Sequence, residues 1–124
     1  MRTSLRLTPE PLTAETFAEY GQVLEIPGVA GRRDFAARVT NSRVSAKPNL
    51  ALVRVEPTAL PLNIDTIECH PASSQAFVPL DGGRYLVVVM SQKPDGSPAP
   101  AHARAFLATD VGMTVLDRPT TSAC

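Results

Sequence analysis

Short apolar segments in period-two alternation, interrupted by prolines, most constrain what this chain can fold into. Twelve prolines are spread through its 124 residues, and proline interrupts both long helices and central strands. Because the side chains of a strand alternate between two faces, a period-two pattern predicts strands. Short strands at close spacing with little helix indicate an all-β barrel or sandwich. The length suggests one domain, residues 1–124.

Several segments carry the strand pattern. Strands are expected over residues 23–26, 50–56, 62–67, 74–80, 85–90 and 103–107. The run Tyr85–Met90 is continuously apolar, which is typical of a central strand buried on both faces. Asp81-Gly82-Gly83 is a turn signal between two strand-like runs. Residues 50–90 are therefore expected to form most of an antiparallel barrel.

One short helix is expected near the N-terminus. Thr13 can be its N-cap, with Glu15 in the first turn and Gly21 as its terminator. Leu12 and Phe17 stand at the positions of a hydrophobic staple. The sequence therefore predicts about two turns of helix before the first strand.

Two polar segments, residues 27–48 and 91–101, are expected to be loops. The first contains four arginines, Arg32, Arg33, Arg38 and Arg43. We interpret them as solvated loop charges rather than as one shared anion site.

Charge and cysteine content narrow the class of protein. The formal net charge is +0, and no basic cluster points to nucleic acid as a partner. No apolar run reaches the roughly 18 residues of a membrane helix, and the N-terminus shows no signal-peptide pattern. The two cysteines, Cys69 and Cys124, make no disulfide framework. We expect a cytoplasmic protein with reduced thiols.

The densest group of polar side chains surrounds His70. Glu68, His70 and Gln75 place a carboxylate, an imidazole and an amide within eight residues, with Ser74 beside them. These groups can supply a base, an acid and an orienting hydrogen bond. In a strand, residues 68 and 70 point to the same face, so both would meet one cavity if that face lines a barrel.

Other interpretations of this group stay open. Glu68 and His70 can be a surface pair at a strand end, or, as i and i+2 residues on one strand, can share a metal ion. The chain has no H-x-H pair, and His102 follows a proline-rich loop where we expect it to be exposed. We therefore predict no bound metal and no cofactor. We expect Cys69 to pack in the barrel wall and Tyr85 in the core.

The run from Ile67 to Leu80, IECHPASSQAFVPL, resembles the E-x-H-P-x-x-x-Q-x-F-x-P signature of the ureidoglycolate lyase family. A glycine-containing turn and the apolar strand Tyr85–Val89 follow it, as in that family. Leu12–Gly21 is similar to the start of the family, and Arg104–Leu107 resembles the segment after its exposed loop. The resemblance covers residues 8–108.

This resemblance implies a cupin-like antiparallel β-barrel, usually dimeric, that releases urea and glyoxylate from ureidoglycolate in purine and allantoin breakdown. Such cleavage needs a base and an acid but no redox cofactor. We expect His70 to be the base or proton shuttle and Glu68 to be its partner. Gln75 and Ser74 are expected to bind substrate, and the loop arginines are candidates for its carboxylate.

The chain also departs from the family pattern. Cys69 stands where the family usually carries an arginine or a similar residue. After Arg104–Leu107 the family continues with a Gly-Val strand and a Trp-His motif. Here Ala108-Thr109-Asp110 passes almost directly to Gly112, and the chain contains no tryptophan. Because missing strands leave unpaired edges, we expect an incomplete barrel that is a weak or inactive enzyme. The alternative is a non-catalytic or degenerate cupin remnant that binds a small carboxylate ligand.

Overall fold

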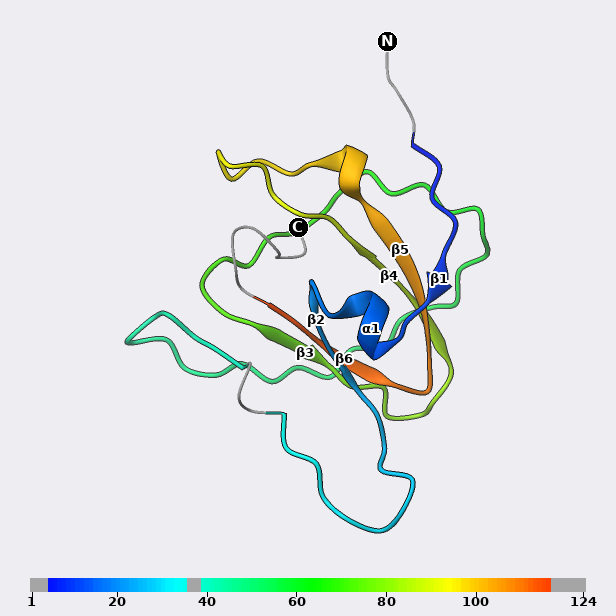
Figure 1. The fold of residues 1–124 in the computed structure, drawn as a ribbon, viewed down its shortest axis with the longest axis vertical. Coiled ribbons are helices and arrows are strands. Elements are labelled where there is room, and N and C mark those ends of the chain that lie inside the picture. Colours follow the sequence, from blue (N-terminus) through cyan, green and yellow to red (C-terminus); the bar gives the residue numbers. More distant parts are fainter. Residues whose placement is uncertain (1–4, 36–38, 117–124) are drawn as a thin grey trace.

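The computed structural model describes residues 5–35 and 39–116 (Figure 1). Cys124 and Arg38 therefore lie outside the described residues. In chain order the elements are β1 (Glu10–Pro11), α1 (Ala14–Phe17), β2 (Gly21–Leu24), β3 (Gln75–Phe77), β4 (Arg84–Val89), the 3-10 helix η2 (Pro100–His102), β5 (Arg104–Thr109) and β6 (Gly112–Val115). The all-β fold class is confirmed, since strands dominate and the single α-helix found in the described residues is short. No helix in the described ranges is long and apolar enough to cross a membrane.

The strands form two three-stranded sheets. One has the order β1-β5-β4 and the other the order β2-β6-β3. All pairs are antiparallel except β1 with β5, which is parallel. The described strands form two open sheets rather than a closed barrel, as expected for an incomplete one (Figure 1).

The two sheets share one hydrophobic core. Val87, Val89 and Phe106 come from the first sheet, and Met113 and Val115 come from the second. Phe106 is fully buried, and its ring meets the ring of Phe17 from α1 edge-on at a centroid distance of 5.4 Å. Edge-to-face contact is a favoured arrangement of aromatic pairs. The helix therefore covers one side of the core.

The N-terminus of α1 follows the sequence prediction. Thr13 is the N-cap: its Oγ1 accepts a hydrogen bond from the Thr16 N–H at 3.1 Å. The Thr16 hydroxyl accepts one in return from the Thr13 N–H at 3.2 Å. The helix is only four residues long, so these two bonds satisfy a large share of the backbone N–H groups at its N-terminus.

Removing the cap should cost measurable stability. We expect Thr13→Ala to lower the free energy of unfolding by about 1 kcal/mol, the usual effect of losing an N-cap oxygen. Urea denaturation followed by circular dichroism would measure it. Thr13→Ser keeps the oxygen and should stay near the parent, so equal losses in both variants would contradict this role.

Gly21 does not terminate the helix, contrary to the prediction. It is the first residue of β2, and α1 ends at Phe17 with Ala18 as its C-cap. A Cβ at Gly21 would lie 1.7 Å from the carbonyl oxygen of Thr114. The position therefore needs glycine because two backbones approach closely there, not because a helix ends.

The prediction that residues 50–90 form most of the barrel is wrong. No strand forms over residues 50–67, and only β3 and β4 fall within 50–90. The apolar side chains of residues 50–56 are exposed, with Val53 at 77% and Val55 at 79%. Alternation shows that one face could be buried, but a strand forms only with a paired neighbour. The described structure gives these residues none.

The turn at residues 81–83 is present, but it does not join a hairpin. Gly82 and Gly83 have positive φ angles of 71° and 105°, which suits the predicted glycines. The strands on either side, β3 and β4, belong to different sheets. The connection therefore crosses from one sheet to the other.

A second crossing lies against the first. Asp110 and Val111 connect β5 to β6, again from one sheet to the other. The Asp110 carboxylate accepts a hydrogen bond from the Gly83 N–H at 2.7 Å, and its own N–H donates to the Gly83 carbonyl at 3.0 Å. Both crossings are therefore joined at the same end of the two sheets.

β4 is an edge strand, and the prediction of a central strand buried on both faces is wrong. Its only paired neighbour among the described residues is β5. Val87 and Val89 are buried, whereas Leu86 and Val88 on the other face are only partly buried. A continuously apolar run was therefore a poor guide to the number of neighbouring strands.

Candidate active site

A cavity of about 1210 Å³ lies between the two sheets on the side of β3 and β4. Its floor includes inward side chains of β4 and β6, among them Val87 and Val115. The unpaired segments 51–57 and 62–68 provide much of its remaining wall. Glu68, His70 and Gln75 all line it. The polar residues of the sequence signature therefore share one concave surface, where ligands are usually held.

Glu68 and His70 are in contact on this wall. His70 Nε2 and Glu68 Oε2 are 3.3 Å apart. The pair is not on a strand, because residues 67–70 have no regular structure and a turn begins at Pro71. The side chain of His70 is 43% exposed and that of Glu68 is 81% exposed. A carboxylate in this position can fix the orientation of the imidazole ring.

Gln75 and Ser74 are placed differently. Gln75 begins β3, opposite Val115 of β6, and lines the cavity. The Ser74 hydroxyl accepts a hydrogen bond from the Thr40 N–H at 2.9 Å and donates to the Thr40 carbonyl at 3.2 Å. Ser74 thus joins the loop around residue 40 to the start of β3 and is not among the cavity-lining residues.

The expectation that Cys69 packs in the barrel wall is wrong. Its side chain is exposed, and its Sγ accepts a hydrogen bond from Gln92 Nε2 at 2.7 Å. The inference used strand alternation, which does not apply where no strand forms.

Tyr85 packs against the core as expected, and its hydroxyl donates to the Val111 carbonyl at 2.8 Å. Burial raises the pKa of Tyr85, and its ring also lines the cavity.

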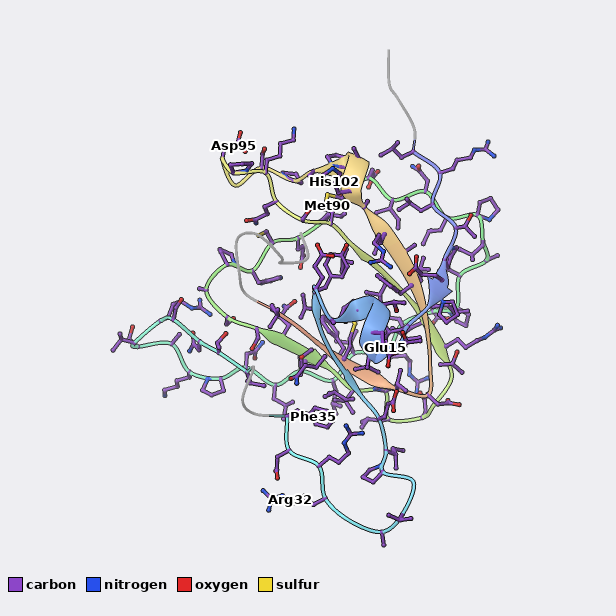
Figure 2. All side chains as sticks on the ribbon, in the orientation of Figure 1. Glu15, Arg32, Phe35, Met90, Asp95 and His102 are labelled. Carbon is purple, nitrogen blue, oxygen red and sulfur yellow. The ribbon has the colours of Figure 1, made fainter. Side chains whose placement is uncertain are left out.

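Of the loop arginines in the described ranges, none lines the cavity. Arg32 pairs with Asp34 at 2.9 Å, and Arg33 lies over the Phe35 ring at 5.3 Å. In Figure 2 Arg32 and Phe35 sit on a loop that projects away from the sheets, whereas His102 lies at the opposite end of the molecule. His102 is exposed, as expected.

Two cavity arginines were missed by sequence reasoning. Arg54 lies in the segment 51–57, and Arg84 is the first residue of β4. The arginine-rich loop is the more conspicuous feature of the sequence, whereas each of these is a single charge within or beside an apolar run. A single charge among apolar residues was the sequence feature that could have pointed to them, because such a charge beside a cavity can face a ligand.

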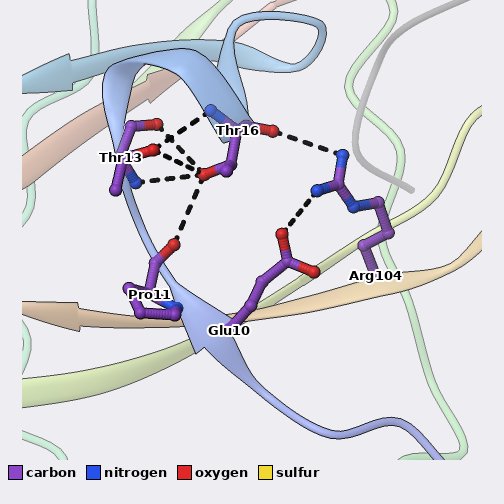
Figure 3. A network of polar contacts seen from close by, with 5 residues as sticks. All are labelled: Glu10, Pro11, Thr13, Thr16 and Arg104. Atoms are coloured by element: carbon purple, nitrogen blue, oxygen red, sulfur yellow. Dashed lines mark hydrogen bonds and ion pairs between the residues drawn. The ribbon is translucent and has the colours of Figure 1, made fainter.

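A second polar cluster lies outside the cavity lining and surrounds Arg104 (Figure 3). Its guanidinium forms an ion pair with Glu10 of β1 and donates to the Thr16 carbonyl of α1 at 3.3 Å. The guanidinium carbon also lies 4.9 Å from the centre of the Phe106 ring. Hydrogen bonding to Glu10 is the main cause that raises the pKa of Arg104. The cluster joins β1, α1 and β5, and we assign it a structural role.

The sequence of this chain is similar to proteins of one known family. A family model described as ureidoglycolate lyase matches residues 4–115. The ureidoglycolate lyases of Brucella melitensis biotype 2 and Brucella ovis are each 38% identical over 120 residues, which cover 89% of this chain and 69% of theirs. That of Rhodobacter capsulatus is 36% identical over 121 residues, covering 90% of this chain and 73% of its own. The resemblance of the signature is thereby confirmed, and this chain belongs to the ureidoglycolate lyase family.

Proposed function

We propose that this protein cleaves ureidoglycolate to glyoxylate and urea in purine and allantoin catabolism. Family membership supports the reaction. The observation that carries the proposal is the contact of Glu68 with His70 on the cavity wall, since it joins a candidate base to a carboxylate. A cytoplasmic homodimer that acts on this small substrate without a cofactor is part of the proposal.

Ureidoglycolate has one carbon that carries a hydroxyl, a ureido nitrogen and a carboxylate. His70 takes the hydroxyl proton, the carbon–oxygen bond becomes a carbonyl, and the carbon–nitrogen bond breaks. The electron pair of that bond leaves with the nitrogen, which takes the proton from His70 and becomes part of urea, so His70 returns to its neutral form. Atoms and charge balance without any oxidant. Glu68 holds the ring and offsets the positive charge that His70 gains during the transfer.

The rest of the cavity wall suggests how substrate is oriented. The Gln75 amide can donate to and accept from the ureido group. Arg54 or Arg84 supplies a guanidinium for the substrate carboxylate, a pairing that favours two parallel hydrogen bonds. Ser74 contributes a substrate contact only if its hydroxyl exchanges its bonds with Thr40 for the ligand.

The direct test is to incubate purified protein with ureidoglycolate and measure urea release. Glu68→Gln should lower this rate by about 10-fold to 10²-fold, because a neutral amide keeps the shape but cannot stabilise the protonated ring. Asp81→Asn likewise replaces an acidic residue on the same cavity by its amide and should leave the rate within about twofold. Equal losses from both substitutions would remove Glu68 from the mechanism.

One observation favours the alternative function, a remnant that binds a small carboxylate without turnover. The cavity wall made by residues 51–57 is open, with Leu52 at 84% exposure and Val53 at 77%. Water has free access to such a site, which weakens electrostatic catalysis. Saturable glyoxylate binding by calorimetry without urea release would support the remnant over the enzyme.

A further inference from the structure

The outer edge of β4 is open in the described structure, and its unpaired backbone groups can be assigned. The Leu12 N–H donates to the Leu107 carbonyl, so the backbone groups of Leu107 face β1 rather than β4. Leu107 lies opposite Leu86, which makes that pair non-hydrogen-bonded. The N–H and C=O groups of Arg84, Leu86 and Val88 therefore point to the open edge.

The segment Ala51–Pro57, named here the strap, is strand-like in sequence but has no paired strand. Among the described residues its backbone makes no hydrogen bond with another segment. Its apolar side chains are exposed, with Leu52 at 84% and Val55 at 79%. The strap has strand alternation and lines the same cavity as all six residues of β4. The unpaired edge of β4 and the unpaired strap thus border the same cavity.

The sequence of the strap selects one alignment with β4. In an antiparallel arrangement with Ala51 opposite Val89, Val53 lies opposite Val87 and continues the core face. The opposite face then places Glu56 against Arg84, which joins unlike charges across the pair. In this alignment the N–H groups of residues 52, 54 and 56 point to β4. Pro57, which has no N–H, falls at a position whose N–H would point away.

We propose that the strap is a mobile fourth strand of the first sheet, which closes on β4 in this antiparallel alignment. Closure satisfies the open-edge groups of β4 and buries Val53 and Val55 against the core. It also narrows the cavity beside Glu68 and His70 and turns Arg54 and Arg84 to the outer face, so either guanidinium can pair with a substrate carboxylate only while the strap is open. The proposal stands on backbone pairing and burial, and it does not depend on which substrate the cavity takes.

A disulfide trap tests the alignment. Val53→Cys/Val87→Cys, in a chain with Cys69 and Cys124 changed to serine, joins a non-hydrogen-bonded pair whose Cα atoms are expected about 4.5 Å apart, within the range of disulfides. Mild oxidation with glutathione should give mostly intramolecular disulfide, seen as a faster band on non-reducing gels. The matched control Val53→Cys/Val89→Cys is displaced by two residues and should oxidise at least about 10-fold more slowly.

Two outcomes would overturn the proposal. Equal rates in the two variants would mean that the strap samples no preferred alignment. Disulfide-linked dimers in place of the intramolecular bond would mean that the edge of β4 serves a second copy. If the cysteine variants fail to fold, hydrogen exchange on the unmodified protein decides. The amides of Leu86 and Val88 should then be protected in a monomer, and rapid exchange of both would contradict closure.

Discussion

Replacing His70 by alanine should lower urea release from ureidoglycolate by about 10²-fold or more, the usual scale for losing a general acid–base. His70 is the imidazole on the cavity wall and is in contact with a carboxylate. Alanine removes the proton acceptor, and no other histidine lines this cavity. Steady-state urea release, measured as kcat/KM, would check this.

His102→Ala is the matched control because it removes the other histidine of the chain. His102 is exposed on η2 and does not line the cavity. We expect its rate to stay within about twofold of the parent. If both alanine variants lost activity equally, His70 would have no special part in the chemistry.

Replacing Phe106 by alanine should lower the free energy of unfolding by about 3–5 kcal/mol. The ring is fully buried, and it contacts both the Phe17 and Tyr20 rings edge-on, at 5.4 and 6.1 Å. It also lies under the Arg104 guanidinium that joins β1 to α1. Because a domain has only about 5–15 kcal/mol of stability, this variant should be largely unfolded in modest urea.

Phe77→Ala provides the comparison for this prediction. Phe77 is 46% exposed on β3, so its truncation should cost no more than about half as much. Urea unfolding of both variants and the parent by circular dichroism would give the two differences. A smaller loss for Phe106 than for Phe77 would show that the core lies elsewhere.

Local chemistry made part of the fold predictable. Thr13 and the residues after it specified a helix start, because a capping hydroxyl acts on backbone groups only a few residues away. The apolar run at Tyr85 specified a strand for the same local reason. Residues 50–67 have equally good alternation but no strand, because pairing depends on a distant edge that a local pattern does not contain. The number of neighbours of β4 was unpredictable for that reason.

The candidate site was predictable to a similar extent. Glu68 and His70 are close in sequence, and the structure brings their side chains together without the expected strand. Cys69 was misplaced because its assignment depended on that strand. Arg54 reaches the cavity from a segment distant in the sequence, and only the arrangement of the chain in space shows this. The roles of Glu68, His70, Ser74 and Gln75 remain predictions for the kinetics to decide.

The bonds between Asp110 and Gly83 have a mechanical consequence. They hold the two crossings together at one end of the sheets, where β4 and β6 begin. At the other end of β6, Val115 pairs with both Gly21 and Gln75, and α1, which packs on Phe106 of the first sheet, leads directly into Gly21. The two sheets are thus linked at both ends, so we expect their separation beside the cavity to stay nearly constant.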